Sequence, residues 1–187
     1  MQAEENFFRD YPGTMKCILA LLFGVGMAAR ALAAADPAQL ADGQRLLAEQ
    51  SLNRNEVDQA VAYAEKAVAL APDSAECQHT LGVVYGGAAQ KASVFKRFGL
   101  ARKCGAAFQR AVALAPANAD FHNSLFEFYR QAPAIVGGGS DKAAAEACRM
   151  GAILEKKGDR AGARAAYNEA LQADPNYAPA AEALKKL

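Results

Sequence analysis

The hexapeptide AVALAP occurs twice in this chain, at residues 67–72 and again, letter for letter, at residues 111–116. A looser copy, ALQADP, occupies residues 170–175. Each copy ends a run in which small or aromatic residues recur at helical spacing, and its proline cannot continue a helix. The copies therefore predict a repeated helical unit that buries its apolar face against neighbouring units.

Alignment of the three copies on their prolines shows one shared apolar face. Residues at positions i, i+4 and i+7 lie on the same side of a helix, and in every copy these positions hold small or aromatic residues. We therefore expect them to be buried in the second helix of each unit. They are Ala60, Ala64 and Ala67, then Cys104, Phe108 and Ala111, and finally Ala163, Tyr167 and Ala170.

A partner helix is expected before each of these helices. The segments that suit it are Leu47-Ala48, Leu81-Gly82 with Tyr85, Leu125-Phe126 with Tyr129, and Met150-Gly151 with Leu154. The pattern resembles the tetratricopeptide repeat family, whose unit of about 34 residues places Leu-Gly, Tyr, Ala, an aromatic residue, Ala and Pro at these offsets. The resemblance covers residues 38–187 and implies an all-α superhelix of about three to four helix–turn–helix units with a C-terminal capping helix, expected from Ala178 to Leu187.

The spacing of the prolines departs from this regular unit in two places. Pro72 and Pro116 are 44 residues apart, so the second unit carries about ten extra residues relative to the family's repeat, and these lie between Tyr85 and Cys104. The interval from Pro116 to Pro175, 59 residues, is too short for two full units. The helix expected over residues 141–157 must therefore belong to both the third and the fourth unit.

The glycine-rich segment 132–142 precedes that shared helix. Three consecutive glycines before a helix could wrap an anion, but the segment lacks the order of a phosphate-binding loop, and Asp141 would oppose a phosphate there. We interpret the segment as a long turn in which Ser140 or Asp141 caps the next helix.

The N-terminal segment has the pattern of an export signal. Met15-Lys16 precedes an apolar run from Ile18 to Ala29, and small residues follow Arg30. A charged start, a short apolar run and a small-residue exit are typical of a secretory signal peptide; an uncleaved anchor is the alternative. We expect residues 1–14 to be a doubtful extension, residues 15–35 a cleaved signal, and residues 36–187 a periplasmic repeat domain.

Composition and the mature cysteines exclude several classes of function. With 21 basic and 20 acidic residues, the chain gives no global reason to expect nucleic acid as a partner. Cys77, Cys104 and Cys148 match no zinc-binding spacing and cannot form a full disulfide framework. They are either three unpaired packing residues or one disulfide with a remaining thiol.

The two histidines do not indicate catalysis or metal binding. In the repeat frame His122 takes the packing position between the helices of its unit, and we expect it in the core. In its own unit His79 comes one position after this packing position. The sequence places no Ser or Cys side chain beside it. No acid, base and nucleophile converge in the pattern. We expect no catalytic residues, no metal and no cofactor, and therefore no enzyme.

The family resemblance implies that the first helices of the units line a concave groove that holds a protein or peptide. The expected partner-binding residues are Arg45, Glu49, Glu76, His79, Asn123, Glu127 and Arg130. The Lys and Asn pattern with which some family members clamp a C-terminal carboxylate is missing from these positions. The function expected from the resemblance is a non-catalytic adaptor or scaffold of the bacterial cell envelope.

The insert in the second unit suggests an alternative function. Between Glu76 and Asp120 the chain has no acidic residue, and Val94, Phe95 and Phe98 interleave with a series of basic ones. Such a segment is typical of a peripheral membrane or polyanion-binding module acting through residues 91–110. A solvated helix face is the other interpretation, with the phenylalanines packed on the preceding helix. The candidate anion-binding residues are Lys91, Lys96, Arg97, Arg102 and Lys103.

Overall fold

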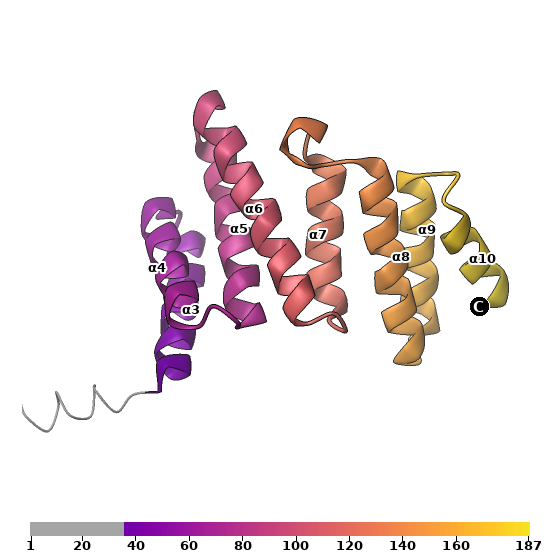
Figure 1. The fold of residues 1–187 in the computed structure, drawn as a ribbon, viewed down its shortest axis with the longest axis horizontal. Helices are drawn as coiled ribbons and strands as arrows, with labels where there is room; N and C mark the ends of the chain where they lie inside the picture. Colours follow the sequence, from indigo (N-terminus) through magenta and orange to yellow (C-terminus); the bar gives the residue numbers. More distant parts are fainter. Residues whose placement is uncertain (1–35) are drawn as a thin grey trace, which may run out of the picture. The chain divides into compact units, whose positions relative to one another are not determined.

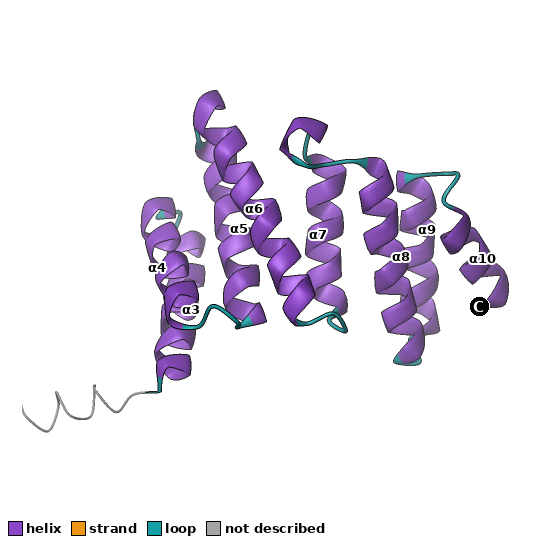
Figure 2. Ribbon diagram, viewed as in Figure 1, coloured by secondary structure: helices purple, strands orange, loops and turns teal. Residues whose placement is uncertain are grey.

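The computed structural model describes residues 36–187, and all of their regular structure is helical (Figures 1 and 2). The expectations for residues 1–35 lie outside this range. Residues 40–187 form one compact unit. Its helices are α3 (Pro37–Asn53), α4 (Val57–Leu70), α5 (Ala75–Lys91), α6 (Val94–Leu114), α7 (Ala119–Gln131), the 3-10 turn η1 (Ala134–Val136), α8 (Ser140–Lys156), α9 (Arg160–Ala173) and α10 (Ala178–Lys186). The predicted all-α repeat fold is confirmed.

The proline of each hexapeptide copy marks the end of the second helix of its unit. Helices α4, α6 and α9 each end two residues before the proline of their copy. Every residue of the predicted apolar face is buried, with between 0% and 7% of its surface exposed. The small residues let neighbouring helices approach closely, and this packing replaces the large side chains that the composition lacks.

Two glycines explain the pairing of helices within the second and last units. A Cβ atom added to Gly82 in α5 would lie 2.6 Å from the Phe108 ring in α6. A Cβ atom added to Gly151 in α8 would lie 2.6 Å from the Tyr167 ring in α9. In both pairs the glycine makes room for the aromatic residue of the partner helix, as the resemblance implies.

Tyrosine hydroxyls join successive units at equivalent positions. The Tyr85 hydroxyl in α5 donates a hydrogen bond of 2.6 Å to Glu65 Oε1 in α4. The Tyr129 hydroxyl in α7 accepts one of 2.9 Å from Gln109 Nε2 in α6. Glu65 and Gln109 each lie seven residues before the proline of their copy. The polar links between units therefore follow the same repeat as the core.

The extra residues of the second unit mainly lengthen its second helix. Helix α6 has 21 residues, whereas the second helices α4 and α9 have 14 each; the first helix α5 has 17, as α3 and α8 do. Helix α6 continues through Gly99 and Gly105, and the Phe128 ring of α7 packs against the bare Cα of Gly105. The α5–α6 hairpin consequently extends past the helices beside it (Figure 1).

Helix α8 packs against helices on both sides, as the proline spacing predicts. Its Glu146 contacts α7 through His122, and its Gly151 contacts α9. Six of its residues are buried: Ala143, Ala144, Glu146, Ala147, Met150 and Gly151.

The prediction that Ser140 or Asp141 caps α8 is wrong. The residue at the cap is Gly139, and it makes no side-chain hydrogen bond. Its backbone N–H donates to the Tyr129 carbonyl at 3.0 Å, which ties the turn to the end of α7. Gly138 lies so close to the Ala132 carbonyl that no side chain fits there. This anchoring places the glycines at the helix entrance and moves both polar residues into the first turn.

Candidate functional site

Helices α3, α5 and α7 share one polar face, which we call the odd-helix face. Two hydrogen bonds connect the helices there. Thr80 Oγ1 in α5 donates to Glu49 Oε1 in α3 at 3.0 Å, and His79 Nε2 in α5 lies 2.8 Å from Ser124 Oγ in α7. The predicted partner-binding residues Arg45, Glu49, Glu76, His79, Asn123, Glu127 and Arg130 are all exposed or half-buried on these three helices.

The charge of Arg45 is neutralised within its own helix. Its Nη2 lies 2.7 Å from Asp42 Oδ1, and its Nη1 lies 2.7 Å from Glu49 Oε1. Burial lowers the pKa of Arg45, but the two carboxylates raise it by more, and the net shift is upward. Glu49 therefore holds both Arg45 and Thr80 and connects α3 to α5.

A second internal ion pair lies on α7. Arg130 Nη2 donates to Glu127 Oε2 at 2.6 Å, and Gln131 Nε2 donates to the same oxygen at 2.8 Å. Burial raises the pKa of Glu127, but these donors outweigh it and leave the pKa below its ordinary value. Asn123, one turn earlier, is exposed. Arg130 and Asn123 are thus presented beside a carboxylate that stays ionised.

His79 lies at the centre of the face. Its ring stacks on Phe121 with centroids 4.7 Å apart, and it also contacts Phe108. Burial lowers the pKa of His79, and the nearby carboxylates Glu49, Asp120 and Glu76 compensate only in part. The imidazole is therefore neutral at pH 7, and the charges around it are mainly negative.

The contact between His79 and Ser124 was not predicted, because the two residues are 45 positions apart in the chain. A histidine beside a serine is also the arrangement of an activated nucleophile. Here, however, Ser124 Oγ donates its proton to the Asp120 carbonyl at 3.1 Å. With the serine proton in that bond, His79 Nε2 is assigned as the donor to Ser124, which is the reverse of a general base. The contact joins two helices and does not activate the serine.

Two of the hollows between the helices are lined by predicted partner-binding residues. One of about 290 Å³ lies between α3 and α5 and is lined by Glu49, His79 and Val83, among others. Another of about 540 Å³ lies between α7, α8 and α9, where Arg130 and Glu169 line it. Within residues 36–187 no three His, Cys, Asp or Glu side chains gather as metal ligands would.

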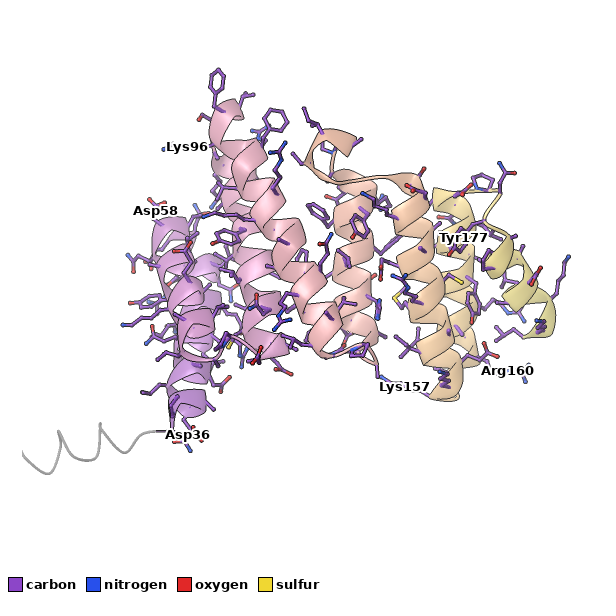
Figure 3. The ribbon with its side chains drawn as sticks, in the orientation of Figure 1. Asp36, Asp58, Lys96, Lys157, Arg160 and Tyr177 are labelled. Carbon is purple, nitrogen blue, oxygen red and sulfur yellow. The ribbon has the colours of Figure 1, made fainter. Side chains whose placement is uncertain are left out.

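The five basic residues predicted to bind anions have separate roles. Arg97 donates to the Ala89 carbonyl near the end of α5 at 3.2 Å, and Arg102 donates to the Ile135 carbonyl of η1 at 3.2 Å. Lys103 lies 3.8 Å from Glu65 and above the Tyr85 ring. Lys91 and Lys96 are exposed near the end of the hairpin, where Figure 3 shows Lys96. Arg97, Arg102 and Lys103 therefore make contacts with other parts of the fold while remaining exposed, and the local sequence did not indicate these contacts.

The remaining candidates lie in or near the core. His122 is 3% exposed, as expected, and its Nδ1 lies 2.6 Å from Glu146 Oε2. Cys77, Cys104 and Cys148 are all free thiols, so the disulfide alternative is wrong. Burial raises the pKa of Cys104 to about 12, which keeps this thiol protonated and unreactive.

Comparison with known proteins identifies one repeat in the sequence and a related fold. Residues 144–177 match the tetratricopeptide repeat model. The search of curated proteins finds no match. The structure is similar to that of the thermophilic TPR protein TTC0263 of Thermus thermophilus, with 19% identity, a TM-score of 0.50, and 78% of this chain and 80% of that chain covered.

Two further solved structures are similar at lower TM-scores. MamA is 20% identical, with a TM-score of 0.43 and coverage of 74% of this chain and 80% of that one. An O-GlcNAc transferase from Thermobaculum terrenum is 21% identical with a TM-score of 0.40, and the match covers 80% of this chain. It spans only 22% of the transferase.

Antiparallel helices that pack in sequence on a repeated pattern of small and aromatic residues define a helical-repeat protein. The 144–177 match coincides with α8, α9 and the turn after them. Residues 144–177 therefore form a tetratricopeptide repeat, and the chain has the fold of a tetratricopeptide repeat protein.

Proposed function

We propose that this protein is a non-catalytic adaptor that holds a partner protein or peptide on the odd-helix face. The observation that carries the proposal is the pair of hydrogen bonds, Thr80 to Glu49 and His79 to Ser124, that joins the three helices at this face. A surface that is rigid before binding loses little conformational entropy when a partner docks. Repeat proteins of this architecture use such extended concave surfaces for binding.

The side chains left accessible describe the partner. Asn123 and Arg130 offer hydrogen-bond donors, and Glu76 and Glu127 offer carboxylates. Of the carboxylates around His79, Glu49 is paired with Arg45, whereas Glu76 and Asp120 form no ion pair among the described residues. A polar segment with its own backbone donors and basic side chains therefore suits this surface. Binding of such a segment should weaken only modestly with salt, because charges of both signs take part.

We place this activity in the bacterial cell envelope, after removal of a signal peptide. The support is the sequence of residues 15–35, with its charged start, its apolar run and its small-residue exit. Fractionation of cells followed by mass measurement of the mature protein tests it. A periplasmic form that begins near residue 36 supports the proposal, and an intact chain in the cytoplasm contradicts it.

Crosslinking in intact cells tests the adaptor proposal. We would compare the protein with a variant in which Asn123, Glu127 and Arg130 are changed to Ala. A control variant changes the exposed residues Asp58, Gln59 and Lys66 of α4 to Ala instead. The first variant should lose a defined partner that the control retains. Capture that is equal in both variants would refute binding on the odd-helix face.

A further inference from the structure

The free end of the α5–α6 hairpin carries an apolar patch that the adaptor function does not use. We call this patch the hairpin tip and define it by Val94, Phe95 and Phe98 of α6, together with Ile135 of the neighbouring turn η1. Their exposed fractions are 60%, 93%, 41% and 69%. Ile135 belongs to η1, and its carbonyl accepts the hydrogen bond from Arg102 of α6 that keeps this turn beside the helix. Contiguous exposed apolar patches mark interaction sites.

The exposure of the tip follows from the geometry of the hairpin. Helix α5 ends at Lys91 and α6 begins at Val94. Phe95 therefore lies in the first turn of α6, beyond the last residue that α5 can place against it. The interpretation that the phenylalanines pack on the preceding helix is wrong for Phe95, whereas Phe98 lines a hollow together with Ala89 and other residues of α5. The Phe95 ring is the most exposed of the large apolar side chains that the structure describes.

Basic residues predominate around the tip, and Asp58 of α4 lines a hollow together with Lys91 and Lys96. Lys91 ends α5, and Lys96 and Arg97 follow Phe95 directly in α6. No acidic residue occurs between Glu76 and Asp120. Arg97 donates hydrogen bonds to the Ala89 and Ala92 carbonyls but is itself exposed, so Lys91, Lys96 and Arg97 all present positive charge to solvent. A convex apolar tip with flanking lysines complements an anionic lipid interface, in which apolar side chains enter the acyl boundary and lysines contact the headgroups.

We propose that the hairpin tip inserts into the interface of a membrane that contains anionic phospholipids. The interaction is peripheral and shallow. Of the helices described, none combines the length and the apolar character that crossing a bilayer requires. Because the tip and the odd-helix face use different residues, membrane contact leaves the proposed partner surface accessible. The proposal stands independently of the adaptor function.

A single tryptophan provides the test, because the chain contains none. Phe95→Trp places an indole at the tip of the full-length protein, and Leu46→Trp places one on α3 at a residue that is 52% exposed. Each variant is mixed with vesicles of phosphatidylcholine alone or of phosphatidylcholine with phosphatidylglycerol. With the anionic vesicles we expect the tip indole to emit at shorter wavelength and to be shielded from acrylamide, whereas the α3 indole remains unchanged. The probe reports its own surroundings, so membrane binding by residues 18–29 does not imitate the result.

Charge reversal at the tip tests the electrostatic contribution. In the Phe95→Trp protein, Lys91→Glu with Lys96→Glu should weaken binding to the anionic vesicles by about tenfold or more, since each basic residue near such a surface contributes about fivefold. Lys185→Glu with Lys186→Glu, at exposed residues of α10, makes the same change in net charge and should have little effect. Circular dichroism spectra that match those of the parent protein establish that both variants are folded.

Three results would overturn the proposal. The tip indole could show no change with anionic vesicles. It could respond equally to vesicles of phosphatidylcholine alone, which would contradict the role of the lysines. Its emission could shift without vesicles as protein concentration rises, which would assign the tip to contact between two copies of the chain.

Discussion

Replacing Glu146 by Ala should strongly destabilise the junction of α7 and α8. Glu146 Oε2 lies 2.6 Å from His122 Nδ1, and its other carboxyl oxygen accepts a hydrogen bond from Arg149. His122 Nε2 is bonded to the Pro116 carbonyl at 3.2 Å. Both ring nitrogens are thus satisfied only while the carboxyl group is present.

The size of this destabilisation depends on whether water can replace Glu146 as the hydrogen-bond partner of Arg149 and of His122. The side chain of Arg149 is 61% exposed, so water replaces its lost partner at little cost. The side chain of His122 is 4% exposed, and water cannot reach it. An unsatisfied buried polar group costs about 1–3 kcal/mol, and breaking a buried pair from one side costs about 3–5 kcal/mol in total. We therefore expect Glu146→Ala to lower the free energy of unfolding by about 3 kcal/mol or more.

Urea denaturation followed by circular dichroism measures this difference. Glu146→Gln keeps the shape and one hydrogen bond and should cost about 1 kcal/mol. The double variant His122→Leu with Glu146→Leu removes both polar groups and should be close to the parent protein in stability. A loss below about 1 kcal/mol for Glu146→Ala, or a double variant less stable than that single one, would refute the reasoning.

Three further predictions concern other positions. Gly82→Ala should lower the unfolding midpoint in urea, because overpacking costs about 1–3 kcal/mol and the gain in helix propensity is only about 1 kcal/mol. Gly99→Ala should raise the midpoint, because a Cβ atom at Gly99 meets no neighbour. Equal shifts in the two variants would contradict the packing argument. At neutral pH a maleimide should modify the half-buried Cys148 well before Cys104, because burial raises the pKa of Cys104 to about 12. Peptide mass mapping measures the order of modification, and modification of Cys104 first would contradict this prediction. Because burial lowers the pKa of His79 from its ordinary value of 6.5, the unfolded chain binds a proton more readily, so acidification through that pH should destabilise the fold. In His79→Gln the free energy of unfolding should depend less on pH in this range. A pH profile equal to that of the parent protein would contradict the contribution of His79.

The repeated sequence pattern predicted most of the core, because the spacing of residues within each short segment defines the buried face of its helix. The small and aromatic residues before each proline define one helix face, and they are the residues that the structure buries. The proline intervals also predicted the longer second unit and the shared α8. These features depend only on distances along the chain, which the sequence contains directly.

Contacts between units depended on information that the sequence does not present locally. The pairing of His79 with Ser124 joins residues on two different helices, and Arg102 finds its acceptor in η1. The cap of α8 was mispredicted because the glycine turn is anchored to Tyr129 in the preceding helix. The predicted partner-binding residues lie on helices α3, α5 and α7, but the sequence could not show that Arg45 and Arg130 are already paired. Their role in binding stays a prediction.

The sharing of α8 between two units also affects how the molecule opens. In a regular repeat array each unit can unfold at its boundary with the next, so local openings are nearly independent. Helix α8 provides no such boundary, since its buried residues contact α7 on one side and α9 on the other. Hydrogen exchange should therefore report α7, α8 and α9 as one cooperative block with a common opening free energy. Helices α3 and α4 can open separately and should exchange faster.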